Sequence, residues 1–168
     1  MATTALDGTP AHTVGELPAV GSTAPAYTLT DGSLGDVTPA DTAGQRVVLS
    51  IFPSVGTGVC AAGLRRFNEL AAGLEGTRVV CVSMDLPFAL SAFCGAEGID
   101  GVVAASAFRS DFGDAYGVRL VDGAFAGLLA RAVVVVDETG TVVHSQLVPD
   151  IAQEPDYDAV LSSLSSLS

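Results

Sequence analysis

Residues 47–60 read Val-Val-Leu-Ser-Ile-Phe-Pro-Ser-Val-Gly-Thr-Gly-Val-Cys, and this stretch decides the fold. Its first six residues form a largely apolar run that is typical of a buried strand. The residues from Val59 to Leu74 follow with helical spacing, so Cys60 lies where a strand passes into a helix. Backbone N–H groups at a helix start lack intrahelical partners, and the helix dipole is positive there. Both features favour a cysteine thiolate over the neutral thiol.

The rest of the chain alternates predicted strands and helices. Strands are predicted at 27–30, 47–52, 78–84, 102–105, 132–136 and 141–146, and helices at 59–74, 87–97, 109–116 and 156–167. Residues 1–24 are irregular, and we expect a short hairpin or arm to begin within 12–17. Alternating strands and helices pair in parallel, and the turn at 137–140 adds an antiparallel hairpin.

This order predicts an α/β fold in which a central mixed sheet is flanked by helices and preceded by an N-terminal extension. The arrangement is similar to the thioredoxin-like folds. We find no linker and no internal repeat in the sequence, so we expect a single domain spanning residues 1–168.

Composition narrows the possible functions. Hydrophobic residues make up 49% of the chain and charged residues 15%, which argues against disorder. The net charge of −12 disfavours nucleic acid as a partner. We see no secretory signal, and Pro53 with nearby glycines interrupts the uncharged stretch 47–64, so no membrane span is expected.

Three cysteines, an odd number, do not suit the disulfide framework of a secreted protein. They suit a cytoplasmic protein with reactive or buried thiols. The sequence has no Cys-x-x-Cys motif and no Cys/His cluster, so we expect no structural zinc site.

Cys60 is the first candidate for chemistry, and two readings of its surroundings stay open. In the first, Thr57, which precedes Cys60 by three residues, places its hydroxyl near the sulfur of a reactive cysteine. Alternatively, Thr57 is only a helix cap and Cys60 a small, inert apolar residue. Local sequence alone does not choose between these readings.

Arg131 is the candidate cation, because it directly precedes the apolar run 132–136. A charged residue at the entrance of a buried strand needs a partner, and a Cys60 thiolate would provide one. The alternative is a solvent-exposed strand end.

For the other two cysteines, the sequence leaves two roles open at Cys94 and favours one role at Cys81. Cys94 lies in the predicted helix 87–97 and is either a buried apolar residue or a thiol that resolves an oxidised Cys60. Cys81 lies inside an apolar strand, where poor access favours a structural role. His12 and His144 are isolated, and we expect both at the surface.

The chain resembles the thiol peroxidase (Tpx-type) subfamily of atypical two-cysteine peroxiredoxins over nearly its whole length. The peroxidatic signature Pro-x-x-x-Thr-x-x-Cys is present at Pro53, Thr57 and Cys60. Further matching segments, in the order and spacing of the family, are Thr13–Pro18, Val20–Pro25, Arg65, Phe67–Asn68, Asp85–Ala89, Phe93–Gly98, Phe108–Arg109, Tyr116–Val118, Gly127–Arg131, Ser145–Val148 and Glu154–Tyr157.

The resemblance implies a function and roles for individual residues. Cys60 would be the peroxidatic cysteine and Cys94 the resolving cysteine of the same chain. Pro53, Thr57 and Arg131 would complete the peroxide site. The family reduces hydrogen peroxide and organic hydroperoxides without a metal or organic cofactor, is recycled by thioredoxin, and is usually a homodimer.

One position departs from the family, which usually has aspartate where this chain has Gly56. The change removes none of the expected site residues. We therefore expect it to affect the reaction rate or the stability of the dimer rather than the type of reaction. Two rival functions remain: a redox sensor that uses the same disulfide, and a non-catalytic interaction module with inert cysteines.

Overall fold

The computed structural model describes residues 1–167, and its chain order matches the expected alternation of strands and helices. The main strands are β5 (Arg46–Ile51), β6 (Thr77–Ser83), β7 (Val103–Ser106), β8 (Ala132–Val136) and β9 (Val142–Leu147). The helices are α1 (Gly58–Ala71), α2 (Pro87–Glu97), α3 (Phe112–Ala115) and α4 (Tyr157–Ser165). Short elements complete the set: β1 (Thr3–Leu6), β2 (Thr9–His12), β3 (Leu29–Thr30), β4 (Asp36–Val37) and the 3₁₀ helix η1 (Pro39–Thr42).

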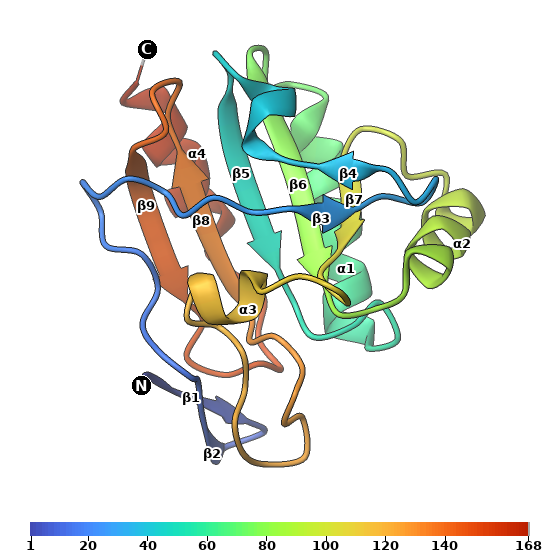
Figure 1. Ribbon diagram of the computed structural model, residues 1–168, viewed down its shortest axis with the longest axis vertical. Helices are drawn as coiled ribbons and strands as arrows, with labels where there is room; N and C mark the ends of the chain where they lie inside the picture. Colours follow the sequence, from blue (N-terminus) through green and yellow to red (C-terminus); the bar gives the residue numbers. More distant parts are fainter. Residues whose placement is uncertain (168) are drawn as a thin grey trace.

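Seven strands form one mixed sheet in the order β4-β3-β7-β6-β5-β8-β9. Strand β6 pairs in parallel with β5 and with β7, because helices make both crossovers. Strand β8 pairs antiparallel with β5 and β9. The expected α/β architecture with a mixed sheet is therefore confirmed, including the hairpin formed by the last two strands (Figure 1).

The central strands have apolar side chains on both faces, and each face builds its own core. Helices α1, α2 and α4 cover one face, where Leu64, Leu90 and Val160 pack with buried residues of β5, β6 and β8. The other face is covered by the segment around β3 and by α3, with Tyr27 and Phe112 in its core. Figure 1 shows α1 and α4 behind the sheet and α3 in front of it.

The N-terminal extension is a hairpin, but its position differs from the prediction. Strands β1 and β2 pair antiparallel and end at His12, whereas the hairpin was expected to begin there. A tight turn at Asp7 and Gly8, both with positive φ, reverses the chain earlier. The sequence signal is weak because the strands are short and mixed in polarity.

Two expected elements are shorter in the structure. The helix predicted at 109–116 is only the single turn α3, and the strand predicted at 27–30 retains two residues. Gly117 ends α3 with a φ of 69°, and a Cβ there would lie 2.2 Å from the carbonyl oxygen of Glu16. The close approach of the N-terminal extension therefore requires glycine at this position.

No helix among residues 1–167 is long and apolar enough to cross a membrane. Residue 168, the last residue of the predicted domain 1–168, lies outside the described part of the chain. The single-domain assignment stays a prediction.

Candidate active site

The loop between β5 and α1 places Cys60 in the first turn of a helix. Thr57 is the N-cap residue, with extended backbone, and its hydroxyl oxygen accepts a hydrogen bond from the N–H of Cys60 at 3.3 Å. Pro53 is buried at the start of this loop. The predicted position of Cys60 at the start of a helix is confirmed, and Thr57 caps that helix. A role for Thr57 toward peroxide stays a prediction.

Arg131 lies immediately before β8 and is only 3% exposed. Its Nη2 donates to the Sγ of Cys60 at 3.0 Å, and its Nε donates to the carbonyl oxygen of Ile151 at 2.8 Å. The alternative of a solvent-exposed strand end is therefore wrong. The β8–β5 pairing explains the contact, because it brings the entrance of β8 beside the end of β5.

The charge of Arg131 needs a counter-charge in this buried position. Among residues 1–167, Arg131 forms no ion pair with a carboxylate, and its contact with Ile151 is to a neutral oxygen. Cys60 is 1% exposed. Of the two described hydrogen-bond partners of the Arg131 side chain, only Cys60 can become an anion. A buried cation without a partner is costly, so the geometry favours the thiolate of Cys60.

Cys94 lies on α2, away from the Arg131 contact. It is half-buried and lines a small surface pocket with Ser91, Ile99 and Val102. Burial raises the pKa of the Cys94 thiol, which disfavours its thiolate in this conformation. Cys60 and Cys94 contribute to the same apolar core from different helices, and both are free thiols.

Cys81 lies in the centre of β6 and is fully buried. Desolvation is the main cause that raises the pKa of its thiol, with a smaller contribution from Cys94. A neutral, inaccessible thiol is a poor nucleophile. The structure thus agrees with the structural role expected for Cys81.

Sequence reasoning assigned no role to Asp85, which contacts the loop before Cys60. The carboxylate of Asp85 accepts hydrogen bonds from the Ser54 hydroxyl at 2.7 Å and from the Val55 N–H at 3.0 Å. A signal was available, because Asp85 follows β6, and the carboxyl ends of parallel β5 and β6 meet at one edge of the sheet. Gly56 belongs to the same loop and donates its N–H to the Ser54 hydroxyl oxygen at 3.0 Å.

The two histidines behave differently from each other. His12 is partly exposed, as expected, and its Nδ1 lies 2.7 Å from Asp122 Oδ2. His144 was expected at the surface, but it is half-buried, because α4 packs over this end of β9. Its Nε2 is buried without a hydrogen bond among the described residues, and burial lowers the pKa of the imidazole.

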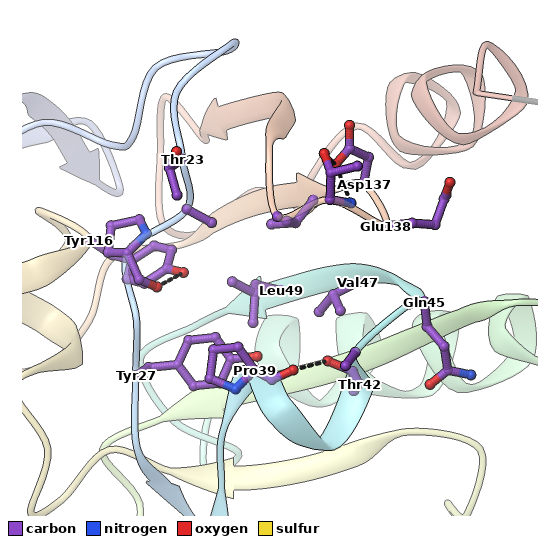
Figure 2. Close-up of a pocket in the computed structure, with 17 residues that line it drawn as sticks. Thr23, Tyr27, Pro39, Thr42, Gln45, Val47, Leu49, Tyr116, Asp137 and Glu138 are labelled. Atoms are coloured by element: carbon purple, nitrogen blue, oxygen red, sulfur yellow. Dashed lines mark hydrogen bonds between the residues drawn. The ribbon is translucent and has the colours of Figure 1, made fainter.

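A separate pocket of about 260 Å³ lies on the opposite face of the sheet from Cys60. Figure 2 shows that Tyr27, Thr42 and Leu49 border it beside the β8–β9 turn. No cysteine and no arginine lines this pocket among the described residues. It therefore belongs to a different part of the molecule from the thiol site.

Comparison with known proteins extends this picture to the whole chain. The redoxin family model matches residues 19–161. The chain is 56% identical to a thiol peroxidase of Mycobacterium tuberculosis over 164 residues, which cover 98% of this chain and 99% of the relative. It is 53% identical to a thiol peroxidase of Corynebacterium glutamicum with the same coverage. A peroxiredoxin-like protein from Aquifex aeolicus superposes with a TM-score of 0.95 at 39% identity, covering 100% of this chain and 98% of that one.

The chain belongs to the redoxin family, and its fold is the thioredoxin-like fold of the peroxiredoxins. Within that family, full-length similarity to thiol peroxidases makes it a peroxiredoxin-type peroxidase, which is an oxidoreductase. The expected family and fold class are confirmed.

Cys81 makes the stability of the reduced protein depend on pH. Its thiol has a raised pKa in the folded protein, whereas in the unfolded chain it titrates near ~8.5. Below that pH the full stability is present. Above it the unfolded chain loses a proton that the folded protein keeps, so the free energy of unfolding falls by up to ~1.4 kcal/mol per pH unit.

Equilibrium unfolding of the reduced wild type and of Cys81→Ala, from neutral to alkaline pH, measures this effect. The variant should lose stability with a shallower slope, while its lower stability at neutral pH reports only the lost packing. Equal slopes for the two proteins would show that Cys81 does not remain protonated in the fold.

Proposed function

We propose that this protein reduces hydrogen peroxide and organic hydroperoxides through Cys60, with Cys94 as the resolving thiol. The observation that carries the proposal is the 3.0 Å contact between the Arg131 guanidinium and the Cys60 sulfur in a buried site. Thr57 caps the helix that bears Cys60, and Pro53 lies buried at the start of the preceding loop, which supports a peroxide-binding role for both.

The first step forms a sulfur–oxygen bond and breaks the peroxide bond. The Cys60 thiolate attacks the terminal oxygen of the hydroperoxide, and the alkoxide leaves and takes up a proton as the alcohol. Arg131 and free N–H groups at the start of α1 stabilise the negative charge that moves from sulfur to oxygen. Cys60 is oxidised to a sulfenic acid.

The second step joins the two cysteines. Cys94 attacks the Cys60 sulfur as a thiolate, and the sulfenic oxygen leaves as water after protonation, which gives a disulfide within one chain. A disulfide needs Cα atoms within about 7 Å, and the two cysteines lie on separate helices. We expect the first turn of α1 and part of α2 to unfold locally on oxidation, and this movement also exposes the Cys94 thiol to solvent.

A dithiol protein of the thioredoxin type then returns both cysteines to thiols. The family to which the chain belongs supports this reductant. We place the cycle in the cytoplasm, because three free cysteines suit a reducing compartment. Detection of the protein chiefly in a secreted or periplasmic fraction of the cell would contradict that placement.

Peptide mapping tests the cycle after one equivalent of cumene hydroperoxide is added to the fully reduced protein. We expect a Cys60–Cys94 disulfide within one chain, Cys81 still free, and faster amide exchange in both helices. Thioredoxin should then restore three thiols. A Cys60 sulfenic or sulfinic acid without the disulfide would contradict the role of Cys94, and an unmodified Cys60 would contradict the peroxidase.

We further propose a homodimer that uses an exposed apolar patch beside α2. The patch consists of Leu86, Phe88 and Phe108, which are 53%, 63% and 37% exposed. Ser106 connects its two parts, because its hydroxyl bonds to the Asp85 carbonyl oxygen and accepts the Phe108 N–H. Large exposed apolar side chains grouped in this way are typical of a protein interface.

Sedimentation velocity of the reduced protein over a range of concentrations tests the dimer. The wild type should sediment as a dimer and Phe88→Ser mainly as a monomer. Val20→Ser is the matched control, because Val20 is 64% exposed but lies beside β9, at the other edge of the sheet. A monomeric wild type, or equal effects of both substitutions, would contradict the proposed interface.

A further inference from the structure

Asp85 is a hydrogen-bond hub that none of the expected site residues includes. It lies between the end of β6 and the start of α2 and is half-buried. One carboxylate oxygen accepts from the Ser54 hydroxyl at 2.7 Å. The other accepts from the Val55 N–H at 3.0 Å and from the Ser83 hydroxyl at 2.6 Å. Three donors converge on one ionised side chain, which makes these bonds strong.

The backbone of Asp85 is also held by hydrogen bonds to the sheet. Its N–H donates to the Ser83 hydroxyl oxygen at 3.2 Å, and its carbonyl oxygen accepts from the Ser106 hydroxyl. Ser83 and Ser106 are the last residues of β6 and β7 and are fully buried. Asp85 is therefore anchored to the sheet, while its carboxylate reaches across to the loop after β5.

The two segments joined by Asp85 are those that carry the two reacting cysteines. Ser54 and Val55 belong to the loop that ends at Thr57, the cap of the helix bearing Cys60. On the other side, Leu86 is the N-cap residue of α2, which bears Cys94. One carboxylate thus connects the loop before one cysteine helix to the first residue of the other.

We propose that Asp85 is a positioning residue of the peroxidase cycle, which holds the loop of residues 53–57 in place for peroxide attack and opposes its release for disulfide formation. The inference rests on the proposed function. Attack on peroxide requires a fixed arrangement of Cys60, Thr57 and Arg131, and a misplacement of about 1 Å costs up to ~100-fold in rate. Disulfide formation requires the opposite, because the first turn of α1 must leave its place.

The two chemical steps should therefore respond in opposite directions when Asp85 is replaced. Without the carboxylate, Ser54 and Val55 lose their acceptor and the loop moves more freely. The first step then slows, because the peroxide site is less often in the reactive arrangement. The second step does not slow, and it becomes faster if opening of the loop limits it. A merely structural loss would not separate the steps in this way.

The steps are measured separately in two series of reduced proteins. In a Cys94→Ser background, trapping of the Cys60 sulfenic acid with dimedone, followed by mass spectrometry, gives the rate of the first step. In chains that keep Cys94, acid quenching and alkylation at successive times give the rate of disulfide formation, provided that peroxide is raised until the observed rate no longer depends on its concentration. Each series includes Asp85→Ala, Asp85→Asn and Ser54→Ala, so the test does not depend on one variant folding.

We expect Asp85→Ala to slow sulfenic acid formation about tenfold or more and to leave disulfide formation unchanged or faster. Asp85→Asn should have a smaller effect in the same direction, since it keeps the shape and one acceptor oxygen. Ser54→Ala should also be milder, because the Val55 bond remains.

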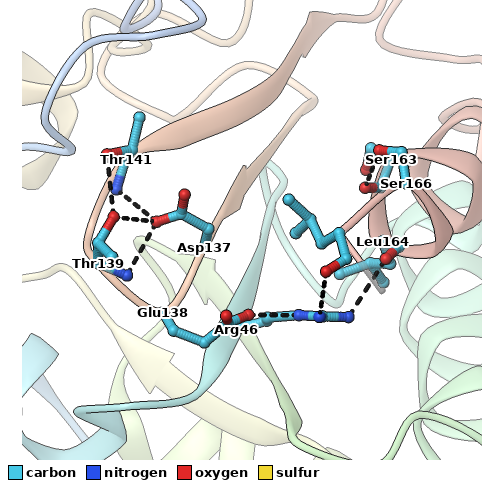
Figure 3. A network of polar contacts seen from close by, with 9 residues as sticks. Arg46, Asp137, Glu138, Thr139, Thr141, Ser163, Leu164 and Ser166 are labelled. Atoms are coloured by element: carbon cyan, nitrogen blue, oxygen red, sulfur yellow. Dashed lines mark hydrogen bonds and ion pairs between the residues drawn. The ribbon is translucent and has the colours of Figure 1, made fainter.

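Asp137→Ala is the matched control. Asp137 is also an aspartate hub, and one of its oxygens accepts from the Thr139 N–H and hydroxyl and from the Thr141 N–H in the β8–β9 turn (Figure 3). No cysteine lies in this turn, so neither step should change.

The inference is overturned if both steps keep their wild-type rates in Asp85→Ala and Asp85→Asn, if both fall by the same factor, or if Asp137→Ala gives the same pattern. Failure of the proposed function looks different, because then the wild type itself forms no sulfenic acid at Cys60.

Discussion

A buried guanidinium in contact with a buried sulfur is the constraint on which the site depends. Arg131 is 3% exposed and Cys60 is 1% exposed, and their contact measures 3.0 Å. The guanidinium is costly in this position without a counter-charge, and a thiolate there is costly without the guanidinium. The sheet provides the pairing: β5 delivers the loop before Cys60, and β8, antiparallel beside it, begins directly after Arg131. Sequence-distant residues thus meet because of strand order.

The site also shows a division between fixed and movable parts. The strand ends that hold Arg131 and Asp85 lie in the sheet, whereas the cysteines lie on helices packed against one apolar core. Cys94 lies on a different helix from Cys60, and burial raises the pKa of its thiol, which disfavours the thiolate. In the proposed cycle the helices open only after Cys60 is oxidised, so the movement follows the reaction with peroxide.

Much of this structure could be predicted from the sequence, and the failures have physical reasons. Residues 47–60 specified the strand, the capped helix and the cysteine, because apolar runs and N-caps are local signals. The Arg131–Cys60 contact was only a possibility, since it depends on which strand lies beside β5. The burial of His144 depends on tertiary packing, which the local sequence does not show. The position of Asp85 directly after a predicted strand was a usable signal, but its hydrogen-bond partners depend on how the loop after β5 folds. The N-terminal hairpin was misplaced because its turn is unusual, with positive φ at Asp7.

The most direct measurement is the rate at which iodoacetamide alkylates Cys60 at neutral pH, followed by peptide mapping, in the wild type, Arg131→Met and Arg119→Met. Loss of a charge-assisted hydrogen bond worth about 1.5–3 kcal/mol removes stabilisation of the negative charge on the reacting sulfur, so Arg131→Met should react roughly 10- to 100-fold more slowly. Arg119→Met should react like the wild type, because Arg119 pairs with Asp114 in an exposed ion pair. Equal rates for all three proteins, each shown to be folded, would contradict the view that Arg131 holds Cys60 as a thiolate.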